Sequence, residues 1–129
     1  MANEFTCVEK PTIIVRRTVA DGTAVVKNTG MKLTSPNTAA ASTTDTPFAG
    51  ITVEEKTASD GIVDMAMALD GVWSGISYAT TTVGTAVKLS NGNLITTAIA
   101  ADLLSGNWCG VAESTATNGN AIRWRARGF

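Results

Sequence analysis

The acidic residues of this chain are spaced in ways that exclude the usual carboxylate chemistry. Glu54 and Glu55 are adjacent, so in a strand they point to opposite faces and cannot flank one substrate bond. Asp64 and Asp70 share a face of a predicted strand, but their separation of about 20 Å is too large for a catalytic pair. The chain contains no histidine, which removes Ser-His and Cys-His nucleophile pairs. We therefore expect that the protein is not an enzyme.

The two cysteines do not indicate a metal site. Cys7 and Cys109 lie far apart in the sequence and neither belongs to a CxxC motif, whereas structural zinc sites need closely spaced ligands. We expect both thiols to be reduced, small and mostly buried. No cofactor is predicted.

The most pointed feature is a run of alternating arginines near the end of the chain. Arg123, Arg125 and Arg127 fall on one face of a predicted strand. Three neighbouring guanidinium groups repel one another unless acidic groups meet them. Two interpretations stay open: the face pairs with carboxylates of this chain such as Asp64 or Glu113, or it contacts an acidic partner protein. The net charge of −1 argues against nucleic-acid binding.

Two tryptophans stand beside glycines that recur along the chain. Trp73 and Trp108 are candidates for packing in the core or between subunits, because tryptophan is most often a partly buried anchor. A sugar-binding platform is the less favoured interpretation.

Strands are predicted to position these residues, because period-2 patterning and turn signals dominate the sequence. Asn91 and Gly92 predict a hairpin turn. Residues 98–105 predict a single short helix, capped by Thr97 and ended by Gly106. Residues 34–47 contain no large apolar side chain before Pro47 and predict a long surface loop. The predicted strands cover residues 12–19, 23–27, 49–56, 63–69, 72–78, 85–90, 93–97 and 120–127.

A weak internal duplication links the two halves of the chain, from about residue 22 to 72 and from 84 to 129. Neither half is large enough to bury its own core, which predicts one β domain over residues 12–129, preceded by an N-terminal arm over residues 1–11. The fold class is all-β, a compact β-barrel-like or β-sandwich subunit. The repeated pairs are Gly22–Val25 with Gly84–Val87, Phe48–Ile51 with Trp108–Val111, Asp60-Gly61 with Asn118-Gly119, and Gly71-Val72 with Gly128-Phe129.

These repeats resemble those of the capsid cement, or head decoration, proteins of tailed bacteriophages. The resemblance implies a virion protein on the outer capsid surface that clamps neighbouring subunits of the major capsid protein, commonly as a homotrimer. It implies that the arm becomes ordered on the capsid. No signal peptide or transmembrane segment is recognisable in the sequence, so we expect synthesis in the host cytoplasm and no membrane partner.

The arm and the arginines supply the candidate interface. We expect residues 2–10 to fold back poorly on their own chain and to add a strand to a neighbour. The alternative function is a phage tail or fibre-base β domain that binds a receptor or glycan through Trp73, Trp108 and residues 34–47. The candidate interface residues are Phe5, Val8, Arg16, Arg17, Trp73, Trp108, Arg123, Arg125 and Arg127.

Overall fold

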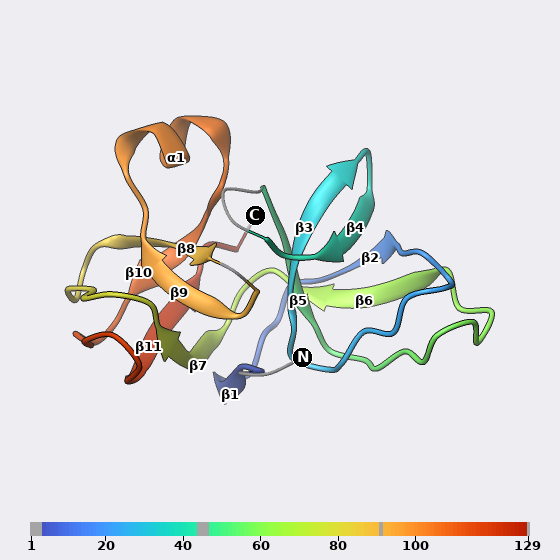
Figure 1. Cartoon of the computed structure of the whole chain (residues 1–129), viewed down its shortest axis with the longest axis horizontal. Coiled ribbons are helices and arrows are strands. Elements are labelled where there is room, and N and C mark those ends of the chain that lie inside the picture. Colours follow the sequence, from blue (N-terminus) through green and yellow to red (C-terminus); the bar gives the residue numbers. More distant parts are fainter. Residues whose placement is uncertain (1–3, 44–46, 91, 129) are drawn as a thin grey trace.

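The computed structural model describes residues 4–43, 47–90 and 92–128. Two β-barrels lie side by side along the longest axis of the molecule (Figure 1). The first barrel closes in the strand order β2-β4-β3-β5-β6. Its strands are β2 (Ile14–Thr18), β3 (Gly30–Ser35), β4 (Thr38–Ala41), β5 (Phe48–Thr52) and β6 (Asp64–Ala68).

The second barrel is built from the other half of the chain. Its strands follow the order β7-β11-β10-β8-β9, and a further pairing of β7 with β9 completes the ring. An additional strand, β1 (Thr6–Glu9), pairs with β7 on its outer side. The ring consists of β7 (Val72–Ser77), β8 (Ala86–Ser90), β9 (Leu94–Thr97), β10 (Trp108–Ala112) and β11 (Ala121–Ala126).

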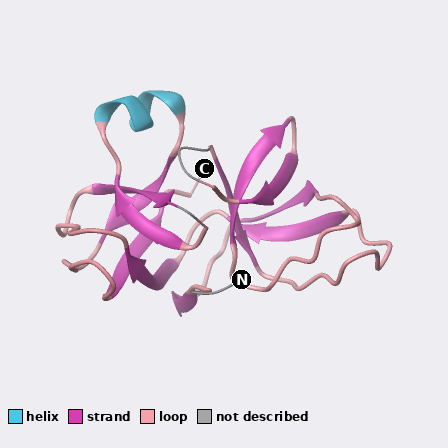
Figure 2. Ribbon diagram, in the orientation of Figure 1, coloured by secondary structure: helices cyan, strands magenta, loops and turns pink. Residues whose placement is uncertain are grey.

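Figure 2 shows strands and one short helix, so the all-β fold is confirmed. The two barrels have the same connectivity, which confirms the internal duplication. β2 is antiparallel to β6 and parallel to β4, as β7 is antiparallel to β11 and parallel to β9. β3 lies between β4 and β5, as β8 lies between β9 and β10. Each strand of the first barrel therefore has one counterpart in the second.

Strand pairing fixes which residues are equivalent. Gly50 is opposite Met31, and Gly110 is opposite Val87, which confirms the predicted match between the two glycines. The match of Gly22–Val25 with Gly84–Val87 is wrong, because Val87 occupies the place of Met31. Val25 corresponds instead to Thr81, since each forms an isolated bridge outside the named strands, to Lys56 and Ala116 respectively.

Two other expectations about local structure are wrong. Residues 23–27 form no strand, and Val25 alone makes a bridge there. Residues 34–47 include the last part of β3 and all of β4, joined by a turn in which Asn37 has a φ of 52°. β4 is held by its backbone pairing with β3 and by the buried methyl group of Ala39. It therefore needs no large apolar residue, which is why the sequence pattern did not reveal it.

The short helix is confirmed as α1 (Ala100–Ser105). It begins after Ile99 rather than Thr97, and Gly106 ends it in the left-handed conformation, with a φ of 78°. β6 was expected to be half-buried, but Ala66 and Ala68 are buried as well as the two methionines beside them. Ala68 faces the core that the two barrels share.

Two apolar clusters form the interior. One lies inside the first barrel, and the other fills the second barrel and continues to β5 and β6 of the first. The expectation that neither half buries a core of its own is therefore wrong for the first half. The shared cluster is therefore what joins the barrels. Its aromatic members are Phe5, Phe48, Trp73 and Trp124.

The N-terminal segment is folded onto this cluster, which contradicts the expectation of an arm that does not fold back. Phe5 is only 2% exposed, and its ring lies 5.3 Å from the Trp124 ring in an edge-to-face arrangement. The space for it comes from two glycines. A Cβ atom at Gly75 would lie 2.7 Å from the Phe5 ring, and one at Gly30 would lie 3.2 Å from it.

We predict that Phe5→Ala lowers the free energy of unfolding by about 3–5 kcal/mol, the range for a buried aromatic side chain. Val8→Ala, on the same segment but 43% exposed, is the matched control and should change stability by less than about 0.5 kcal/mol. Urea titration measures both. Equal stabilities of the two variants would contradict the structure.

Gly110 gives a second stability prediction. A Cβ atom there would overlap the carbonyl oxygen of Arg125, so Gly110→Ala should destabilise the protein by about 3 kcal/mol. A Cβ at Gly22 meets no atom within 4 Å, which makes Gly22→Ala the control with little expected effect. If Gly110→Ala unfolded at the wild-type urea concentration, the close pairing of β10 with β11 would be wrong.

Candidate interaction surfaces

The arginine face of β11 is paired within the chain. Arg125 Nε donates to Glu113 Oε2 at 2.8 Å, and Arg125 Nη2 lies 3.4 Å from Glu9 Oε2. Arg123 Nε lies 4.0 Å from Glu113. The hydrogen bond and charge of Glu113 raise the pKa of Arg125. The interpretation of pairing within the chain is therefore confirmed for Glu113.

Asp64 does not take part in that face. It accepts a hydrogen bond from Arg16 Nε at 2.8 Å, on the first barrel, and this bond lowers the pKa of Asp64. Asp70 has a different role, because its carboxylate accepts the backbone N–H groups of Thr12 and Ile13, both at 2.8 Å. The two aspartates thus serve separate structural contacts and no common site.

Arg127 crosses from the second barrel toward the first. Its guanidinium carbon lies 5.4 Å from the Trp108 ring centroid and 5.9 Å from that of Phe48. It also donates to the Trp108 carbonyl oxygen at 3.0 Å. Burial lowers the pKa of Arg127. Arg127 therefore contacts an aromatic ring of each barrel. The alternation of residues in the sequence did not reveal these contacts.

Neither candidate tryptophan is fully exposed. Trp73 is 1% exposed and its Nε1 donates to the Asp70 carbonyl oxygen at 3.1 Å, so packing in the core is confirmed for it. Trp108 is half-buried beneath Arg127.

Both cysteines are free thiols. Cys109 is buried, and burial raises the pKa of its thiol. Cys7 is exposed on β1, so the expectation of burial is wrong for it. β1 pairs with β7, and all four of its residues are exposed.

The remaining predicted interface residues do not gather into one patch. Arg16 and Arg17 belong to β2 of the first barrel, and Arg17 Nε donates to the Ala49 carbonyl oxygen at 2.8 Å. Val8 is exposed on β1, beside the Glu9 that meets Arg125. The structure therefore brings the N-terminal segment to the arginine face of β11 but leaves the β2 arginines apart from it.

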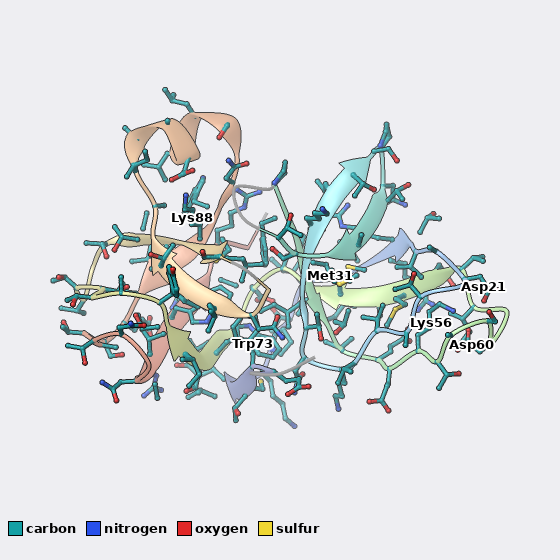
Figure 3. The ribbon with its side chains drawn as sticks, in the orientation of Figure 1. Asp21, Met31, Lys56, Asp60, Trp73 and Lys88 are labelled. Atoms are coloured by element: carbon teal, nitrogen blue, oxygen red, sulfur yellow. The ribbon has the colours of Figure 1, made fainter. Side chains whose placement is uncertain are left out.

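A charged cluster that the sequence did not reveal closes the far end of the first barrel. The side chain of Lys56 is fully buried, and its Nζ lies 3.2 Å from Asp21 and 2.5 Å from Asp60. The three residues converge at the end of the barrel (Figure 3). The equivalent position in the second barrel is Ala116, so the ionic closure belongs to one copy of the repeat.

Within the described residues, no three histidine, cysteine, aspartate or glutamate side chains are grouped so that they could hold a metal ion. The described part of the chain also contains no helix long and apolar enough to cross a membrane.

The cluster gives a pH prediction. The hydrogen bond from Lys56 lowers the pKa of Asp60 from 3.8 to about 2. Since the folded-state pKa lies below the unfolded one, this contribution to stability is present above pH 3.8 and is lost as the pH falls to about 2. Asp60→Asn should be less stable than wild type at neutral pH, and its stability should fall less steeply on acidification. Urea titrations across this range test it, and parallel curves for the two proteins would contradict it.

The fold has a counterpart among solved structures. The N base of the head fiber gp8.5 of bacteriophage phi29 superposes with a TM-score of 0.57 over 88% of this chain and 94% of that chain, at 13% sequence identity. No protein-family model matches the sequence, and no curated protein sequence matches it. At this level of identity, the likeness establishes that the two chains share a fold.

Proposed function

We propose that this protein is a structural component of a bacteriophage head that attaches to the outer capsid surface and clamps neighbouring subunits of the major capsid protein. The observation that carries the proposal is the likeness to a head fiber base over nearly the whole of both chains. The repeat of residues 48–51 in residues 108–111, which the strand register bears out, is the part of the resemblance to head decoration proteins that supports it as well.

The architecture suits such a role. Closed barrels leave few unpaired strand edges, which limits premature association of free subunits. Two barrels fixed to one another by a shared core present contacts at two separated places. When one barrel binds, the other is held near its own site at high effective concentration, so two weak contacts combine into firm attachment.

Attachment of this kind stabilises the shell by mass action. A protein that binds only the assembled shell raises the free energy of separating its subunits. This role needs no reactive group. A homotrimer at three-fold positions is part of the proposal, and the number of copies bound per shell tests it.

The alternative, a tail or fibre-base domain that binds a glycan, has less support. Sugar recognition commonly uses an exposed aromatic face, and Trp73 is buried while Trp108 lies beneath Arg127. Among the described residues, Tyr78 is the exposed aromatic side chain, at 51%, so it is the one that a glycan site there would use.

The direct test is co-sedimentation with empty shells assembled from the major capsid protein encoded in the same genome. We expect saturable binding, a copy number that is a multiple of three, and a higher temperature of shell dissociation. Absence of binding, together with glycan-array binding that Tyr78→Ser abolishes, would contradict the proposal and favour the alternative.

A further inference from the structure

Helix α1 has an inverted distribution of polarity. A surface helix normally turns its apolar side chains toward the core. Of the six helix residues, all of which the structure describes, Asp102 alone is buried. Leu104 is 91% exposed, Leu103 is 44% exposed and the preceding Ile99 is 63% exposed. The helix therefore faces solvent with its apolar side.

Polar contacts hold the helix in this orientation. Lys88 Nζ of β8 lies 3.1 Å from Asp102 Oδ2, and both side chains are largely buried. The same carboxylate accepts the Ile99 backbone N–H at 2.9 Å, and the Gly106 carbonyl oxygen accepts a hydrogen bond from Arg127 at 3.3 Å. Lys88 lies below the helix, toward the barrel (Figure 3). The apolar side chains are thus presented from a fixed support.

The helix lies in a connection that is longer than its counterpart in the first barrel. The first barrel joins β4 to β5 through the six residues 42–47, whereas the second joins β9 to β10 through the ten residues 98–107. Neither apolar core includes a residue of α1. An addition to one copy of a repeat that leaves apolar side chains in water is better explained by a contact outside the chain.

The size and charge of the surface identify the kind of partner. Three side chains offer an apolar area on the order of 300 Å². Two copies that met through it would bury about 600 Å², well short of the roughly 1,200 Å² that stable interfaces need. A second copy that met only through this surface would therefore be held weakly, whereas on a shell this contact adds to those made by the rest of the protein. Residues 98–107 carry no charge except the buried Asp102, so the complementary surface is apolar and uncharged.

We propose that Ile99, Leu103 and Leu104 form a docking knob that inserts into an uncharged apolar groove on a subunit of the phage shell. This inference rests on the proposed function and adds the contact element. Leu103 and Leu104 are adjacent residues of α1, and Ile99 is the exposed N-cap residue directly before the helix. Helix-in-groove recognition places apolar side chains of a helix in a hydrophobic groove.

The test is the affinity of Leu103→Ser/Leu104→Ser for shells of the major capsid protein. Loss of each buried leucine contact should weaken binding by about 10- to 100-fold. Val83→Ser removes an exposed apolar side chain of the second barrel, at 55% exposure, and serves as the matched control with unchanged affinity. Thermal unfolding of the free variants should stay close to wild type, because these leucines lie outside both cores.

A second experiment distinguishes this contact from one made by the arginine face. Shell binding through an apolar knob should vary little with salt, whereas contact through exposed arginines weakens as salt rises. Arg123→Gln/Arg125→Gln should therefore bind shells with nearly wild-type affinity.

Each outcome decides the proposal. If wild-type protein binds shells and the double leucine variant binds equally well, the docking assignment is overturned and the proposed function stands. If wild-type protein does not bind shells, both are overturned. If the leucine variant instead loses an oligomer of the free protein, seen by sedimentation velocity, a second copy covers α1 and the proposal is likewise overturned.

Discussion

The rest of the structure depends on one packing arrangement, the insertion of the Phe5 ring between the two barrels. The ring contacts the bare backbone of Gly75 in the second barrel and approaches Gly30 of the first. It also meets Trp124, which in turn contacts Phe48 across the junction, with ring centroids 6.5 Å apart. The backbone N–H of Phe5 donates to Asn28 of the first barrel at 3.0 Å, while the following strand pairs with β7 of the second. The N-terminal segment therefore contacts both barrels and holds them together.

Beyond this junction, the two copies have diverged in ways that suit different tasks. The first barrel closes its far end with the buried Lys56 and its two aspartates, where the second has Ala116. The second barrel carries α1, supported by the ion pair of Lys88 with Asp102. The addition to the first barrel is thus a buried charged cluster, and the addition to the second barrel is an exposed helix. Under the proposed function, the first stabilises the body of the protein and the second contacts the shell.

The features predictable from the sequence are those set by local chemistry. The repeated Asp60-Gly61 and Asn118-Gly119 pairs are signals of this kind, and Gly61 and Gly119 adopt the same φ of 84° at equivalent turns. Gly50 and Gly110 were matched because each follows a large aromatic residue by two positions. The short helix and the β8–β9 hairpin were predictable for the same reason, although Asn91 of the predicted turn lies outside the described residues. Each of these signals is contained within a few neighbouring residues.

The features that were missed depend on residues distant in sequence. Phe5 has no apolar periodicity around it, and its burial requires glycines at positions 30 and 75. Lys56 donates to Asp21, which lies 35 positions earlier in the sequence. No local sequence pattern indicates such a contact. The outward side of α1 follows from Lys88, which binds Asp102 from another strand. Thus the candidate arginines were identified from the sequence, whereas their partner Glu9 and the exposed helix surface needed the fold.

The central claim is that a shared core makes the two barrels one cooperative unit. Differential scanning calorimetry of the intact chain tests it most directly. The account predicts a single transition whose calorimetric and van't Hoff enthalpies agree, because neither barrel can lose the Phe5 junction alone. Two resolved transitions, or a calorimetric enthalpy well above the van't Hoff value, would contradict it and show that the barrels unfold independently.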